Sequence, residues 1–124
     1  MLIDIETGKE ISTIPHKTDF DSFLKKISTS DYQKIVDKLN SVIDTDKLKG
    51  SEIQTAGWIP GNDWSGTVYE PIENIFHNNK DASGKIFGIT VWKVFMDRED
   101  KWGFGRYSVK DTPIESMTYF GVTV

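Results

Sequence analysis

The turn Pro60-Gly61-Asn62-Asp63-Trp64-Ser65-Gly66 precedes a predicted helix and offers backbone N–H groups to an anion. The positive end of a helix dipole favours negative charge, and glycine allows a close approach of the backbone. The spacing differs from that of a phosphate-binding P-loop, and no lysine stands where that motif places one. A plain strand-to-helix connection explains the same residues, and it is the more common use of such a turn.

Large aromatic residues crowd the second half of the chain. Tryptophan and tyrosine join a broad apolar surface to a polar tip, so they recur in ligand sites and protein interfaces. Trp92 stands in the most apolar segment and is predicted to be core, whereas Trp64 and Trp102 fit a core or a surface site equally well. The aromatic set comprises Trp58, Trp64, Trp92, Trp102, Phe104, Tyr107, Tyr119 and Phe120.

Two arginines accompany these rings. Arg98 lies in the charged run 97–101, which we interpret as a hairpin loop. Arg106 shares a predicted strand face with Trp102 and Phe104. Arginine stacks on aromatic rings and holds a carboxylate or phosphate through two hydrogen bonds, so this face suits a ligand or a partner. A solvated hairpin tip with one cross-strand ion pair is the simpler interpretation of the same charges.

The residue types do not favour catalysis. The chain has no cysteine, which excludes thiolate metal sites and cysteine nucleophiles. His16 and His77 do not stand at metal-ligand spacing, and no serine nucleophile elbow or complete GxGxxG motif is present. We therefore expect no cofactor and no metal, and we favour a binding protein over an enzyme.

The leading hypothesis is a non-catalytic binding module that holds a protein partner or a small molecule on its aromatic and arginine surface. The alternative is a small enzyme or a nucleotide- or anion-binding protein with its site at the Gly61–Gly66 turn, helped by Arg106 and His77. The residues that we predict to bind are Trp58, Asn62, Asp63, Trp64, Arg98, Trp102, Arg106 and Tyr107.

Composition predicts one folded domain over residues 1–124. Apolar residues make up 37% and charged residues 27%, a balance typical of globular proteins, and a chain of this length builds its own core. The net charge of −4 argues against a nucleic-acid partner. The N-terminus lacks the pattern of a secretory signal, and the apolar stretch 86–96 is too short for a membrane span. We expect a cytoplasmic protein with no membrane contact.

In the first half, residues 1–15 are predicted to form a hairpin or arm and residues 18–50 a pair of helices. Gly8 supplies the turn of the hairpin. The hairpin is either an edge of the sheet or an arm that pairs with another subunit, and the second alternative predicts a homodimer. Apolar residues at helical spacing, beginning with Phe20 and Phe23, define the helices.

The second half, residues 51–124, is predicted to hold an aromatic-rich sheet and one helix over 67–76. The expected strands are 52–59, 85–97, 102–109 and 114–123, with 85–97 at the centre because it is apolar on both faces. The predicted fold class is therefore α+β, with an antiparallel sheet of about four strands packed by three amphipathic helices.

Overall fold

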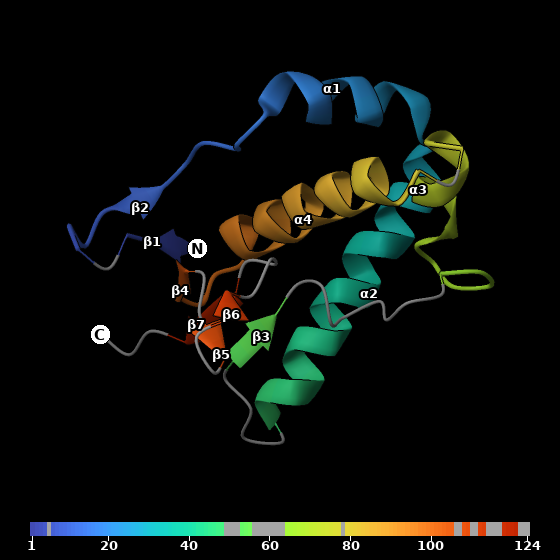
Figure 1. The fold of residues 1–124 in the computed structure, drawn as a ribbon. Helices are drawn as coiled ribbons and strands as arrows, with labels where there is room; N and C mark the ends of the chain where they lie inside the picture. The colour runs from blue at the N-terminus through green and yellow to red at the C-terminus, as the bar shows by residue number, and fades with distance from the viewer. Residues whose placement is uncertain are drawn as a thin grey trace.

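A computed structural model of the chain (Figure 1) describes residues 1–4, 6–48, 53–55, 64–77, 79–105, 108–109, 112–113 and 118–121. These residues form four helices and seven short strands, so the fold is α+β as the sequence predicts. Five strands make one sheet in the order β2-β1-β4-β7-β3, and β5 (Ser108–Val109) pairs with β6 (Thr112–Pro113) separately.

The predicted N-terminal hairpin is present. Strand β1 (Leu2–Ile3) pairs antiparallel with β2 (Glu10–Ile11), and Gly8 in the turn has a φ of 71° that favours glycine. Strand β1 also runs parallel to β4 (Trp102–Gly105), with Leu2 beside Trp102. The hairpin is therefore part of the sheet. The sheet is mixed, whereas the sequence predicts an antiparallel one.

Four of the other described strands lie inside the predicted ranges. Strand β3 (Ile53–Thr55) lies within 52–59, β4 and β5 lie within 102–109, and β7 (Thr118–Gly121) lies within 114–123. Strand β7 pairs antiparallel with both β3 and β4. The remainder of those predicted ranges lies outside the described residues.

Helices α1 (Lys17–Lys26) and α2 (Thr29–Leu48) occur close to the positions that the periodicity indicates. Each presents one apolar face to the core, which includes Phe20 and Phe23 from α1 and Ile35 and Leu39 from α2. The Ser28 hydroxyl accepts a hydrogen bond from the backbone N–H of Asp31, at 3.0 Å, and so caps α2. Helix α3 (Glu70–Ile75) is shorter than the predicted 67–76 and has a proline in its first turn.

The prediction of a central strand at 85–97 is wrong: this segment belongs to helix α4 (Lys80–Asp97). The side chain of Asn79 caps the helix by accepting a hydrogen bond from the N–H of Ala82 at 3.2 Å. The helix is buried on several sides, so the polar stripe that reveals an amphipathic helix is missing. Its β-branched and aromatic residues are also those that strands favour. The protein accordingly has four described helices rather than three.

Helix α4 is the centre of the molecule (Figure 1). It packs against α1, α2 and α3, and its C-terminal end meets the sheet. There the Phe95 ring stacks on Tyr119, with centroids 4.1 Å apart, and meets Trp102 edge-on at 4.9 Å. The amino group of Met1 donates to the backbone oxygens of Phe95, Arg98 and Asp100, which satisfies carbonyls at this helix end. None of the described helices has the length and apolarity needed to cross a membrane.

Candidate functional site

A cleft lies between α1, α4 and the turn that follows α3, with a volume of about 320 Å³. This volume falls at the lower end of the range of about 300–1,000 Å³ that is usual for small-molecule sites. Helices α1 and α4 supply all but one of its lining side chains. We call it the α1–α4 cleft, and its lining residues are Asp19, Ser22, Phe23, Lys26, Phe76, Ala82, Lys85 and Ile86.

The floor of the α1–α4 cleft is apolar because its residues belong to the stripes that bind the helices together. Phe23 comes from the buried face of α1 and Ile86 from the buried face of α4. The half-buried ring of Phe76, just after α3, lies nearly parallel to the ring of Phe23, with an interplanar angle of 19° and a centroid distance of 6.3 Å. The small side chain of Ala82 on the first turn of α4 leaves room beside these rings.

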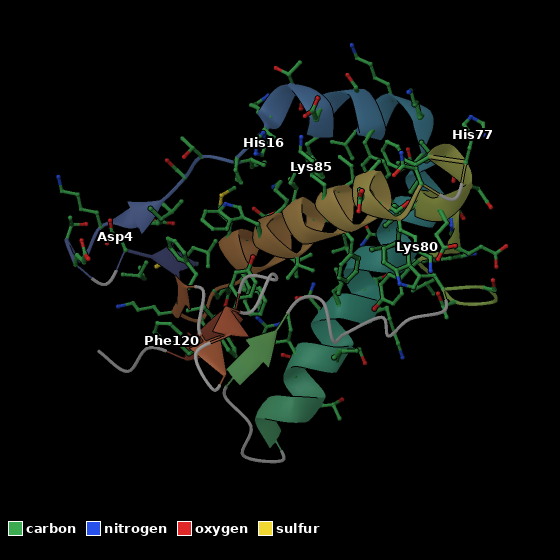
Figure 2. All side chains as sticks on the ribbon, in the orientation of Figure 1. Asp4, His16, His77, Lys80, Lys85 and Phe120 are labelled. Carbon is green, nitrogen blue, oxygen red and sulfur yellow. The ribbon has the colours of Figure 1, made fainter. Side chains whose placement is uncertain are left out.

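The rim of the α1–α4 cleft is charged. Lys85 donates to the Asp19 carboxylate at 2.8 Å, which links α4 to α1, and Figure 2 shows Lys85 in the space between these two helices. The hydrogen bond and the charge of Lys85 lower the pKa of Asp19. Lys26 is exposed and makes no hydrogen bond or ion pair within the part of the chain that the structure describes. The cleft thus joins an apolar floor to one paired and one unpaired ammonium group.

Of the residues that we predicted to bind, Trp58, Asn62, Asp63, Arg106 and Tyr107 lie outside the described residues. The Gly61–Gly66 turn is therefore described only from Trp64 onward.

Trp64 lies half-buried at an aromatic cluster. Its ring centroid is 6.3 Å from that of Tyr69 and 5.4 Å from that of Phe87 on α4. Trp102, in contrast, is only 1% exposed and belongs to the core around Phe95. In this structure Trp102 offers no surface to a ligand or partner, because its ring is buried against Phe95 of α4.

Arg98 is engaged by the protein itself. Its Nε and one terminal nitrogen donate to the two oxygens of Asp100, each at 2.9 Å. The remaining bonds reach the side chains of Asn40 at 2.9 Å and Asp44 at 2.6 Å, both on α2. With four hydrogen bonds made and a side chain only 12% exposed, Arg98 ties the end of α4 to α2. A ligand at this guanidinium would compete with those partners.

The two histidines lie far from each other. His16 precedes α1 and His77 follows α3, and Figure 2 shows them toward opposite ends of the helical layer. Both have a φ of 51°, which a histidine adopts more readily than a bulky residue does. Within the described residues, no three histidine, aspartate or glutamate side chains gather as a metal site.

Sequence reasoning missed the α1–α4 cleft. Phenylalanine, isoleucine and alanine at helical spacing indicate core, and lysines near a helix end indicate a solvated surface. No motif marks these residues, because the cleft arises from the way that α1 and α4 approach each other. Since the sequence assigned 85–97 to a strand, it could not place Lys85 and Ile86 opposite α1.

Compared with protein-family models, with curated proteins and with solved structures, the chain matches none of them. The protein is an α+β domain. The geometry of the site is the observation that bears on its function.

Proposed function

We propose that this protein is a non-catalytic binding module that holds a small molecule with an apolar body in the α1–α4 cleft. The observation that carries the proposal is the cavity of about 320 Å³, with an apolar floor and a few polar groups at its rim. Small-molecule sites have this composition: apolar walls supply affinity, and a few polar groups fix orientation. The ligand would lie against Phe76 and Ile86.

The proposal keeps the class of function that the sequence favours and changes the location of the site. An aromatic and arginine surface has less support, because Trp102 is buried and Arg98 is engaged by Asn40, Asp44 and Asp100. An anion site at the Gly61–Gly66 turn, a protein partner, a homodimer and a cytoplasmic location stay predictions.

A fluorescent probe tests the proposal. Phenylnaphthylamine is uncharged and apolar, and its emission rises when it leaves water. We expect it to bind the native protein saturably. Ser22→Phe places a ring into the cleft from α1 and should weaken binding about tenfold or more, because the probe and the new side chain compete for one volume. Ala82→Phe fills the same volume from α4 and should act alike.

Ser41→Phe is the matched control, because Ser41 is an exposed helical serine on α2 that does not line the cleft. This variant should bind the probe as the native protein does. Thermal unfolding of each variant checks that it is folded. The proposal is wrong if the native protein does not bind the probe, or if folded Ser22→Phe and Ala82→Phe proteins bind it with native affinity.

A further inference from the structure

The charges at the rim of the α1–α4 cleft oppose the charge of the molecule as a whole. The chain carries a net charge of −4, yet the lining of the cleft holds two lysines, Lys26 and Lys85, and one carboxylate, Asp19. Two positive charges and one negative charge leave a local charge of +1. A cleft with apolar walls concentrates such a field, because the low dielectric of the protein screens it less than water does.

The two lysines have different roles. Lys85 is held by Asp19 at 2.8 Å, so its charge is largely neutralised where it stands. Lys26 has no such partner among the described residues, and its exposed ammonium group can pair with an anion at the rim. Lysine presents a compact charge with three donors on a flexible stem, which reaches an anion without a fixed geometry.

We propose that the ligand of the α1–α4 cleft is an amphipathic anion: an apolar body bearing one carboxylate or sulfonate that pairs with Lys26. This inference rests on the proposed function, since it specifies what the same cleft binds. The apolar body lies on the floor at Phe76 and Ile86, and the anionic group stays at the open rim. The Asp19 carboxylate does not repel this group, because Lys85 already compensates it. A cationic ligand would meet the charge of Lys26 and would bind more weakly than the anion.

A pair of probes with the same ring system separates the charge from the apolar body. Anilinonaphthalenesulfonate carries a sulfonate, and phenylnaphthylamine lacks it. We define the anion preference as the Kd of the neutral probe divided by the Kd of the sulfonate. Lys26→Gln should lower this preference about two- to fivefold, the size of one ion pair at an exposed rim. Added salt should lower the preference of the native protein in the same direction.

Lys25→Gln is the matched control. Lys25 neighbours Lys26 in the last turn of α1, and both are exposed, so either substitution changes the net charge and the helix end alike. Of these two neighbouring lysines, only Lys26 lines the cleft. We expect Lys25→Gln to keep the native anion preference. Equal losses in the two variants, or no loss in Lys26→Gln, would overturn the inference.

The outcomes separate this inference from the proposed function. If the neutral probe binds and Ser22→Phe abolishes its binding, while the anion preference does not depend on Lys26, the cleft is a site for neutral ligands. If neither probe binds the native protein, both proposals fail. If both probes bind, Ser22→Phe weakens the binding of both, and the anion preference depends on Lys26, both proposals are supported.

Discussion

At the scale of single residues, the core contains polar atoms that it does not satisfy. Within the described residues, the buried side-chain atoms without a hydrogen-bond partner are Tyr69 Oη, Ser83 Oγ, Trp102 Nε1 and Tyr119 Oη. Each such atom gives up hydrogen bonds to water on folding, which costs about 1–3 kcal/mol. Two of the four, on Trp102 and Tyr119, belong to the rings that pack against Phe95. Around Phe95, ring packing therefore coincides with two polar atoms that have no partner among the described residues.

We expect Tyr119→Phe to stabilise the protein. The substitution removes the unsatisfied hydroxyl and keeps the ring that stacks on Phe95. The free energy of unfolding should rise by about 1 kcal/mol, and Tm by about 3–5 °C. Urea and thermal unfolding measure both. Tyr32→Phe is the control, because Tyr32 is only half-buried, and it should change the stability much less. A less stable Tyr119→Phe protein would show that the hydroxyl contributes a favourable interaction.

At the scale of elements, helix α4 carries two glycines in its interior. Gly84 and Gly88 have ordinary helical backbone angles, and a Cβ atom added at either would meet no other atom within 4 Å. Glycine weakens a helix interior because the unfolded chain has more freedom to lose. Gly84→Ala and Gly88→Ala should each raise the free energy of unfolding by about 0.5–1 kcal/mol.

Gly66→Ala is the matched control for this prediction. A Cβ atom there would also meet nothing within 4 Å, but Gly66 has a φ of 76°. Alanine is strained in that conformation, so this variant should lose about 1 kcal/mol. Denaturant unfolding of the three variants therefore compares two glycines with ordinary helical angles to one in the left-handed region. If alanine at 84 and 88 destabilises the protein as it does at 66, the ordinary helical angles of these two glycines are contradicted.

Arg98 joins two elements, and its substitution should be costly. Arg98→Lys keeps the charge but loses the planar fork that contacts Asp100 twice and reaches α2. We expect a loss of about 2 kcal/mol in the free energy of unfolding, since hydrogen bonds to charged groups are worth about 1.5–3 kcal/mol. Asp44→Asn, at a side chain that is 61% exposed, should cost less than about 1 kcal/mol. Equal losses would contradict this role for Arg98.

The elements also show what the sequence can and cannot predict. Helix α2 is predictable because Ile35, Leu39 and Ile43 repeat on one face while the opposite face is polar. The N-terminal hairpin is predictable because Gly8 marks its turn. Helix α4 is not predictable by the same rule, because burial on several sides removes the polar face that carries the period.

The candidate site is not predictable from the sequence for the same reason, because it depends on helix α4. The cleft needs Lys85 and Ile86 on a helix opposite Phe23 of α1, and this arrangement depends on tertiary packing rather than on local spacing. The aromatic residues are prominent in the sequence, yet Trp102 packs against Phe95 and belongs to the core. Residue type alone does not distinguish a binding ring from a core ring, because both bury a large apolar surface.

At the scale of the whole molecule, the stability depends on keeping buried phenols neutral. Burial raises the pKa of Tyr69 to about 12 from its ordinary value of 10.0. Burial also raises the pKa of Tyr119. The pKa of Tyr32 is raised mainly by burial and to a smaller extent by the charge of Asp97. These phenols lie in different parts of the fold: Tyr69 packs on Phe87, Tyr119 on Phe95 and Tyr32 on Phe20. Ionisation of these phenols therefore affects packing in several parts of the fold.

We expect the protein to lose stability in alkali as a consequence. A phenol whose pKa is higher in the folded than in the unfolded state stabilises the fold fully below pH 10. Between pH 10 and about 12 the unfolded chain releases protons that the folded chain retains, so the free energy of unfolding falls with pH. The urea midpoint, followed across this interval, should decrease. The tyrosinate absorbance of the folded protein should appear later in the titration than that of the denatured chain.

The variant Tyr69→Phe isolates one contributor, because it removes a titrating group and keeps the ring against Trp64 and Phe87. Its urea midpoint should decrease less steeply between pH 10 and 12 than that of the native protein. The double variant Tyr69→Phe with Tyr119→Phe should show a still smaller decrease of the midpoint over this interval. Lysines also titrate in this interval, but they are common to all three proteins and cancel in the comparison. A folded protein whose four tyrosines all titrate near pH 10 would contradict the burial of these phenols.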